Sequence, residues 1–338
     1  MKSFTHQQDA PFRESRAFAP RAAAHARAGS ERDFEIVLHV GHPKTATTWL
    51  QAKIFENPET GFVVPWADAS ARAIAAFVTV NPYRREAAWA RGFFGEELER
   101  LADDPRVPVL SAETLCGDPF QRRYNGRDVA DRIHQTFPRA KVLIGIREQK
   151  AMVISSYREF IMLGGTLSLE DFVGTGHEPL SFTPILREDF LAYDFVVGYY
   201  QELYGRENVL VLPIEQLQRD QAGYVQTILD FCGCPGRLPI EAEPCHTGWS
   251  ATALVARRML NPLIPTSPLS LGHRQLRNRV ANRLCGAINR LPRRWSAATE
   301  RRWKDQVDRR YAGAFRESNR RLAELTGLDL AALGYDLD

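Results

Sequence analysis

The sequence predicts an α/β protein with three αβα layers, a central parallel sheet of about five strands and a helical C-terminal part. Short apolar runs typical of buried strands alternate with segments of helical periodicity. Several of these runs end in charged residues, and ligands of parallel sheets bind outside the carboxyl ends of the strands. The last hundred or so residues (about 250–338) carry helical patterns alone.

The length of 338 residues and the hydrophobic fraction of 44% suit one large domain. We expect a disordered N-terminal tail over 1–33, where Arg, Ala and Ser are frequent and apolar periodicity is weak, followed by a single domain over 34–338. The formal net charge is only +3, so the overall charge does not favour a nucleic-acid partner.

The sequence favours a cytoplasmic location. It has neither the apolar core of a secretory signal at its start nor an apolar run long enough to cross a bilayer. Its five cysteines are odd in number and irregular in spacing, which favours free thiols and gives no zinc-binding pattern.

The expected elements follow from the periodicity. Strands are predicted at 36–38, 62–64, 107–113, 141–148 and 208–217. Helices are predicted from residue 49 and over 83–102, 126–137, 149–163, 168–173, 188–204, 222–231, 250–260 and 302–326. Residues 164–184 are rich in Gly, Ser, Thr and Pro and are expected to form a loop or lid.

The first strand leads through a Gly-His-Pro turn into Lys44, three threonines and an apolar helical run. The first N–H groups of a helix have no intrahelical partner, so such a junction can bind an anion. Lys44 adds a full charge, and Thr45, Thr47 and Thr48 add hydroxyls. The alternative is an ordinary strand–helix turn in which one threonine caps the helix.

Charged residues follow three of the predicted strands. Lys44 follows the first, Glu113 ends the run 107–113, and Arg147 lies near the end of the run 141–148. In a parallel sheet the carboxyl ends share one edge, so these three side chains are expected on one rim.

Three separated segments resemble the sulfotransferase superfamily that uses 3′-phosphoadenosine 5′-phosphosulfate (PAPS). The segment 42-HPKTATTWLQ-51 resembles the family's 5′-phosphosulfate loop, with Ala46 in place of the usual glycine. The segment 147-REQKAMVISSYREF-160 resembles the 3′-phosphate motif. The C-terminal stretch 311–335 is similar to the end of bacterial-type sulfotransferase domains, and 208–217 also fits.

The resemblance implies a P-loop-like fold and PAPS as co-substrate, without a metal. Lys44 would neutralise charge on the bridging oxygen of the donor. The 5′-phosphate would be held by the loop and helix start, namely Thr45, Ala46, Thr47, Thr48 and Trp49. The 3′-phosphate would be held by Arg147 and Ser155, with Tyr157 completing the motif.

Two other classes remain as alternatives: a nucleotide kinase and a non-catalytic nucleotide-binding protein. A kinase-type Walker A loop needs glycine and lysine where this sequence, counted from Gly41, has Ala46 and Thr47. The lysine comes earlier, at Lys44, and we find no strand-end aspartate suited to Mg²⁺. This pattern favours sulfuryl transfer, because the sulfuryl group carries less charge than a phosphoryl group.

Three residues are candidates for the general base. Glu113 is the first choice, because burial at a strand end would raise its pKa toward the working pH. His42 lies beside Lys44, and His246 precedes a predicted helix.

The resemblance implies that the acceptor is a hydroxyl of a carbohydrate or a lipid-linked glycan. Acceptor pockets are expected in loops over 65–83, 118–125 and 164–187. The basic region 273–303 alternates arginine with apolar residues, and it could lie on an anionic membrane surface or form a packed helix with a solvated basic face.

Overall fold

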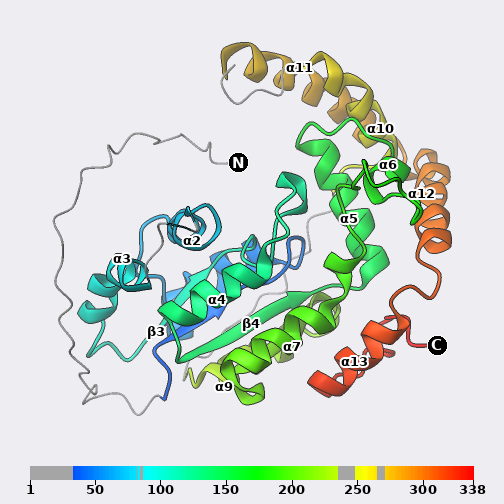
Figure 1. The fold of residues 1–338 in the computed structure, drawn as a ribbon. Helices are drawn as coiled ribbons and strands as arrows, with labels where there is room; N and C mark the ends of the chain where they lie inside the picture. The colour runs from blue at the N-terminus through cyan, green and yellow to red at the C-terminus, as the bar shows by residue number, and fades with distance from the viewer. Residues whose placement is uncertain (1–32, 82, 84–86, 235–247, 265–270) are drawn as a thin grey trace.

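The computed structural model describes residues 33–81, 83, 87–234, 248–264 and 271–338. Within these residues five strands form one parallel sheet in the order β2-β3-β1-β4-β5. The strands are β1 (Ile36–His39), β2 (Phe62–Val63), β3 (Val107–Ser111), β4 (Ala140–Ile146) and β5 (Val209–Pro213). The predicted α/β class, with a parallel sheet of about five strands, is therefore confirmed (Figure 1).

The first strand lies at the centre of the sheet. Val37 of β1 pairs with Val109 of β3 on one side and with Lys141 of β4 on the other. All four residues of β1 are buried, which explains why this strand has a continuous apolar run instead of alternating polarity.

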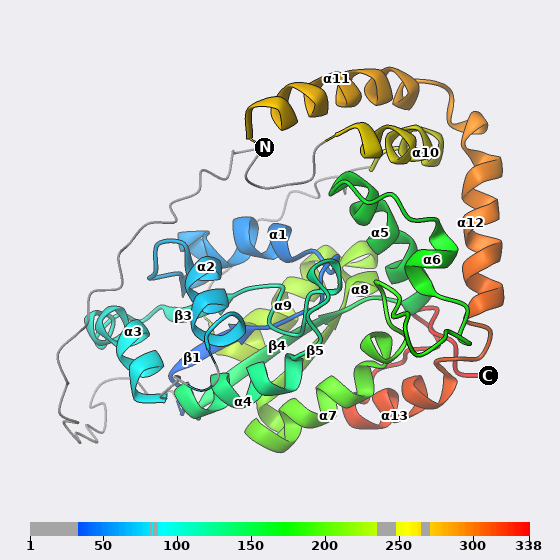
Figure 2. The ribbon, with the colours of Figure 1, turned by 45° about the horizontal axis from the view of Figure 1, so that its top comes forward.

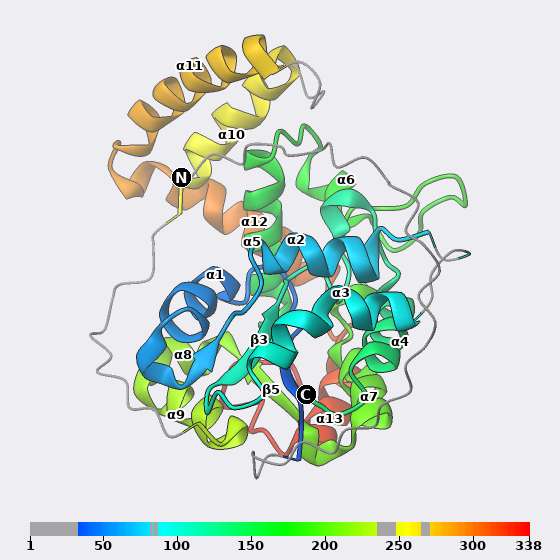
Figure 3. The ribbon, with the colours of Figure 1, turned by 90° about the vertical axis from the view of Figure 1, so that its left-hand side faces the viewer.

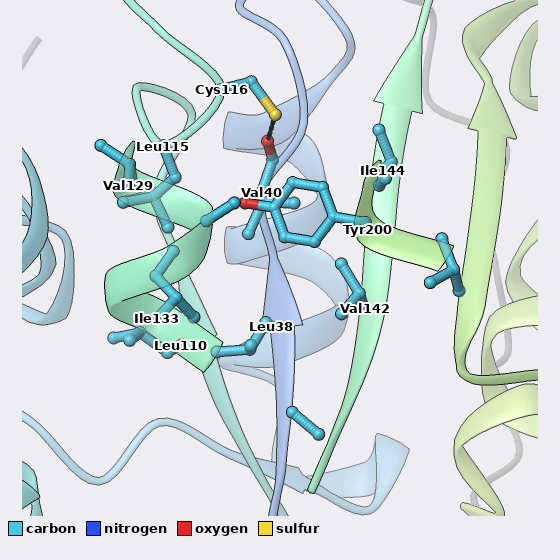
Figure 4. Packing of buried hydrophobic residues seen from close by; sticks show 14 of the residues in the cluster. Leu38, Val40, Leu110, Leu115, Cys116, Val129, Ile133, Val142, Ile144 and Tyr200 are labelled. Atoms are coloured by element: carbon cyan, nitrogen blue, oxygen red, sulfur yellow. Dashed lines mark hydrogen bonds between the residues drawn. The ribbon is translucent and has the colours of Figure 1, made fainter. Parts of the chain in front are cut away.

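Helices cover both faces of the sheet, as the three-layer prediction requires. On one face, Leu38 and Val142 pack against helices that include α4 (Gly126–Thr136) and α7 (Tyr193–Tyr204). Figure 4 shows Tyr200 of α7 lying over these strands, with the Cys116 thiol donating to the Val40 carbonyl at the strand end.

On the other face, Val37 and Leu143 pack with α9 (Gln221–Cys232) and with the helical stretch that starts at α1 (Thr47–Leu50) and continues as a π-helical turn through Phe55. Figures 2 and 3 show α1, α8 and α9 on this side and α2, α3, α4 and α7 on the opposite side.

A separate hydrophobic core lies beyond the carboxyl end of β4. It is built by α5 (Gln149–Met162), α6 (Leu169–Val173), α10 (Ala251–Leu260) and α12 (Ala297–Arg310). Tyr157 of α5 is fully buried there against Trp303 of α12, with ring centroids 5.2 Å apart. The C-terminal helices therefore pack directly on the helix that follows β4.

The other helices are α2 (Ala69–Ala73), α3 (Ala87–Arg100), α8 (Ile214–Arg219), α11 (Leu271–Asn289) and α13 (Arg316–Thr326). No helix among the described residues is long and apolar enough to cross a bilayer.

Three local predictions need correction. The expected strand 208–217 ends at Pro213, because Ile214 and Leu217 are both buried at helical spacing and start α8. The expected helix 302–326 is two helices, α12 and α13, separated by a turn in which Gly313 has φ of 69°. The expected loop 65–83 contains α2 and a π-helical turn, whose Ala73, Ala76 and Phe77 are buried.

Candidate active site

Three candidate side chains follow three adjacent strands of the sheet. Lys44 follows β1, Glu113 follows β3 and Arg147 follows β4, and these strands are neighbours in the order β3-β1-β4. After β1 the chain forms β2 and β3 on one side of this strand and then β4 and β5 on the other, so the crevice at the end of β1 is a topological switch point. Open α/β sheets bind their ligands at such crevices.

The loop after β1 lies directly against the end of β4. A Cβ atom on Gly41 would approach the Gly145 nitrogen to 2.8 Å, and one on Gly145 would approach Thr45 Oγ1 to 2.6 Å. Glycine at both positions therefore permits the loop to rest on the sheet edge. Thr45 Oγ1 donates to the His42 carbonyl at 2.6 Å and closes the turn.

Two non-glycine residues of this loop have left-handed backbone conformations. The φ angles are 68° for Lys44 and 65° for Ala46. Alternation of left- and right-handed residues turns successive N–H groups toward one side and forms an anion-binding concavity. Ala46 holds the position where the resembling family usually has glycine, a residue that adopts this conformation without steric cost.

The start of α1 has donors without acceptors among the described residues. Ala46 is its N-cap and provides no side-chain hydrogen bond to the first N–H groups. Thr47 is buried, with 4% of its surface exposed, and its Oγ1 has no partner within the described part of the chain. A buried hydroxyl without a partner is costly, so this position suits a bound anion. Thr48 is exposed, and Trp49 packs partly into the neighbouring core.

Lys44 reaches α5. Its ammonium nitrogen lies 3.1 Å from Oε2 of Glu159, and both side chains are about one-third exposed (33% and 39%). Glu159 was missed by the sequence prediction. The signal was present, because Glu159 is four residues after Ser155, which puts both on one face of a helix.

Glu113 lies just beyond β3, within electrostatic reach of Lys44 and Glu159. The residue is exposed, but nearby protein removes enough solvent to raise the pKa of its carboxyl. The Lys44 charge opposes this rise in pKa, whereas the charges of Glu159 and Asp118 reinforce it.

A buried polar network holds the end of β3 just before Glu113. Ser111 Oγ lies 2.8 Å from His39 Nδ1 and accepts from Gln51 Nε2 at 3.0 Å, while its carbonyl accepts from Ser70 Oγ at 2.8 Å. These contacts join β1, β3, α2 and the helical stretch after the loop. The network therefore fixes the end of β3 from which Glu113 follows.

The second predicted motif divides into two parts. Arg147 is half-buried, and its guanidinium donates to the Lys44 carbonyl at 3.4 Å, which brings it to the loop. Ser155 is partly exposed on α5, where Glu159 of the same helix pairs with Lys44. Tyr157 is buried in the core around α5, and its hydroxyl donates to the Leu167 carbonyl at 3.1 Å.

His42 lies beneath the loop, not on its open side. It is 2% exposed, and its ring packs against Phe190 and Tyr193 with centroids 5.0 and 4.8 Å away. Burial lowers the pKa of His42 to about 4, and hydrogen bonding to the carbonyls of Gly145 and Phe190 opposes this only in part. The ring is therefore neutral at neutral pH.

His246 lies outside the described residues. Four cysteines in the described part of the chain are free and buried, namely Cys116, Cys232, Cys234 and Cys285. No group of three or more His, Cys, Asp or Glu side chains in the described ranges is placed to hold a metal ion.

The sequence matches a known protein family. The sequence profile of the family described as sulfotransferase domain matches residues 35–261, which include all of the predicted site residues placed above. Comparison with curated proteins gave no significant match.

Solved structures of sulfotransferases are also similar. A sulfotransferase from Alicyclobacillus acidocaldarius is 25% identical, with a TM-score of 0.42 over 62% of this chain and 86% of that chain. The sulfotransferase domain of the Synechococcus PCC 7002 olefin synthase is 15% identical, with a TM-score of 0.39 over 76% of this chain and 98% of that one. A sulfotransferase domain from the curacin biosynthetic pathway is 13% identical, with a TM-score of 0.40 over 62% and 78%.

The family match covers about two-thirds of the sequence and spans the loop after β1, the end of β3 and the start of α5. The protein belongs to the sulfotransferase domain family and is a sulfotransferase.

Proposed function

We propose that the protein transfers a sulfuryl group from PAPS to a hydroxyl group of a carbohydrate or lipid-linked glycan. The observation that carries the proposal is that Lys44, Glu113 and Arg147 follow three adjacent parallel strands at the switch point of the sheet. The donor, when bound, supplies the sulfuryl group, whose bond to the bridging phosphate oxygen breaks as the acceptor oxygen attacks in line.

The loop after β1 is proposed to hold the 5′-phosphosulfate. The N–H groups from Thr45 to Trp49 would donate to it, together with the Thr47 hydroxyl, which lacks a partner among the described residues. The Lys44 ammonium would stabilise the negative charge on the leaving oxygen. The left-handed conformations of Lys44 and Ala46 support this role, because they turn N–H groups to one side of the loop.

Arg147 and Ser155 are proposed to bind the 3′-phosphate, which distinguishes PAPS from simpler adenylates. Arg147 contacts the loop through a single long hydrogen bond, and it has no ion pair within the described ranges. Its guanidinium therefore keeps donors for a phosphate. Tyr157 would act indirectly, because its buried ring and its bond to Leu167 hold α5 in place.

Glu113 is proposed as the general base that takes the acceptor proton. Its raised pKa brings it closer to neutral pH, and an exposed carboxyl at the strand end is open to an acceptor. His42 is a weaker candidate, because it is buried against two aromatic rings and its pKa of about 4 makes it a poor proton acceptor.

We further propose that residues 34–338 form a single domain in the cytoplasm. The packing of α12 on α5 and of α13 on α7 supports one folding unit, and the free cysteines agree with a reducing compartment. The acceptor class follows from the resemblance of the sequence motifs.

Two measurements test this function. In titration calorimetry, 3′-phosphoadenosine 5′-phosphate should bind without metal, and ATP with Mg²⁺ should bind far more weakly. Labelled PAPS should transfer its sulfuryl group to members of a glycan and glycolipid panel, and Lys44→Ala should reduce this turnover by at least about a hundredfold. Tight binding of Mg²⁺-ATP with no binding of the bisphosphate would instead identify a kinase-like protein.

A further inference from the structure

The region from α10 to the start of α12 has an unusual charge. Between residues 251 and 299 the sequence has nine arginines and no aspartate, glutamate or lysine. The whole chain, in contrast, has nearly balanced charge, with 44 basic and 41 acidic residues. A segment with charge of one sign creates a local positive potential that favours an anionic partner.

Exposed apolar side chains gather in the same region. Half of the large hydrophobic side chains that are exposed in the described residues lie between 259 and 295; they are Met259 (67%), Leu263 (65%), Val280 (48%), Leu284 (54%), Leu291 (41%) and Trp295 (60%). Exposed apolar side chains at this density within one short stretch of the chain indicate an interaction site.

On α11 the two kinds of side chain form adjacent stripes. Val280, Leu284 and Ala287 recur at spacings of four and three, and all are exposed. Arg279 and Arg283 recur at a spacing of four, Arg290 follows just after the helix ends, and all three are exposed as well. Within the described ranges these three arginines make no ion pair, so their charges face solvent.

The inner face of α11 is held by α10. The buried guanidinium of Arg257 on α10 donates to Asn278 at 2.6 Å and to Asn282 at 3.0 Å, and Arg277 of α11 donates back to the Leu263 carbonyl at 2.8 Å. The apolar stripe is therefore not needed to hold the hairpin of α10 and α11 together.

The hairpin lies beside the candidate site. In Figures 1, 2 and 3, α11 is at the periphery and α10 lies between it and α5. On α10, Arg258 donates to the hydroxyl of Tyr157 on α5 at 2.9 Å, and α5 also carries Ser155 and Glu159. The hairpin is therefore joined through α10 to the helix that carries two of the candidate site residues.

We propose that the outer face of α11 docks on an anionic lipid membrane. Charge complementarity identifies the partner, because four exposed arginines, Arg279 and Arg283 on α11 and Arg290 and Arg294 just after it, would face acidic headgroups. The apolar stripe would enter the boundary between headgroups and acyl chains, as in interfacial amphipathic helices. The docked protein would bind an acceptor that is embedded in the membrane while the protein stays on the membrane surface.

Cosedimentation of the full-length protein with vesicles tests this surface. Vesicles of phosphatidylcholine mixed with phosphatidylglycerol should bind the protein, and pure phosphatidylcholine vesicles should bind it far more weakly. Arg279→Gln/Arg283→Gln should reduce binding to the anionic vesicles about thirtyfold. The matched control Arg100→Gln/Arg139→Gln also removes two exposed arginines, but on other elements, and should leave binding unchanged.

The apolar contribution is tested with Val280→Ser/Leu284→Ser, which should weaken binding at least about tenfold. The control Phe195→Ser removes an aromatic ring that is 65% exposed on α7, and it should have no effect. Equal vesicle binding by the α11 variants and wild type would overturn the proposal. So would a wild-type protein that does not bind vesicles but forms a dimer in solution, if Val280→Ser/Leu284→Ser dissociates that dimer. The assay needs no sulfate donor, so its result is independent of whether PAPS is the donor.

Discussion

Lys44 Nζ lies 3.1 Å from Glu159 Oε2, so the cation at the proposed phosphosulfate loop is paired with an anion from α5. Both side chains are about one-third exposed, and such ion pairs contribute at most about 1 kcal/mol. A donor phosphate can therefore displace Glu159 from Lys44 at little cost. Because Glu159 also raises the pKa of Glu113, one acidic residue is coupled to both proposed catalytic groups.

Glu159→Gln should strengthen donor binding and shift the pH dependence of turnover. Removal of the competing anion is expected to tighten the binding of 3′-phosphoadenosine 5′-phosphate about two- to fivefold. It should also lower the pKa of Glu113, because Glu159 raises that pKa, so the acid limb of the kcat/KM profile should move to lower pH. Glu170→Gln, an exposed change on α6, is the control. If the acid limb does not move, Glu159 does not influence the pKa of the catalytic base.

Glu113→Gln should abolish most turnover while donor binding stays intact. Loss of a general base typically costs at least about a hundredfold in rate. In wild type the rate should rise with pH as Glu113 loses its proton, with a midpoint above the ordinary carboxyl pKa of 4.5. Steady-state rates and calorimetry measure the two effects, and an unchanged rate would exclude Glu113 as the base.

The same variant should make the fold more stable at neutral pH. A carboxyl with a raised pKa binds its proton more tightly in the folded state than in the unfolded state, so its ionisation destabilises the fold as pH rises through this range. Glutamine cannot ionise and removes this cost. The midpoint of urea unfolding at pH 7 should therefore increase, and a decrease would show that the attraction between Lys44 and the Glu113 carboxylate outweighs the cost of its desolvation.

Arg147→Ala should weaken binding of nucleotides that carry a 3′-phosphate. A hydrogen bond to a charged group contributes about 1.5–3 kcal/mol, so the affinity for 3′-phosphoadenosine 5′-phosphate should fall about ten- to a hundredfold. The affinity for adenosine 5′-monophosphate should change little. Arg139→Ala is a matched control, because Arg139 precedes β4 whereas Arg147 follows it. Equal losses for both nucleotides would point to a structural role for Arg147.

Two buried histidines should make the protein sensitive to acid. Burial lowers the pKa of both His39 and His42 to about 4, below the ordinary 6.5, so the unfolded state binds more protons between these values. The stability is fully present above pH 6.5 and is lost as pH falls toward 4. At pH 5 the loss should be about 2 kcal/mol per histidine.

Urea unfolding of His42→Leu at pH 7 and pH 5 measures this effect. Between pH 7 and pH 5 the free energy of unfolding should fall by about 2 kcal/mol less in the variant than in wild type, because leucine does not titrate. His177→Gln, at an exposed position, should behave like wild type. An identical loss in His42→Leu and wild type would assign the acid sensitivity to other groups.

The α/β class and the approximate positions of the five strands could be predicted from the sequence alone, and the anion-binding role of the segment around Lys44 stays a prediction. These features are local: apolar runs such as that of β4 identify buried strands, and the order of turn, lysine and threonines identifies a helix start. Two element boundaries could not be predicted: the break between α12 and α13, and the start of α8 at Ile214. In both cases the apolar pattern continues across the boundary.

The order of neighbouring strands and the side chains that meet at their ends could not be predicted from the sequence and come from the structure. The pairing of Lys44 with Glu159, the burial of His42 against Phe190 and the Thr47 hydroxyl left without a partner in the described residues depend on contacts between segments far apart in the chain. Periodicity cannot specify such contacts, because it records which face of one element is buried and not what covers it. The approach of α5 to the loop after β1 pairs Lys44 with Glu159, and the neighbouring ends of β3 and β4 bring Glu113 and Arg147 to the same edge of the sheet.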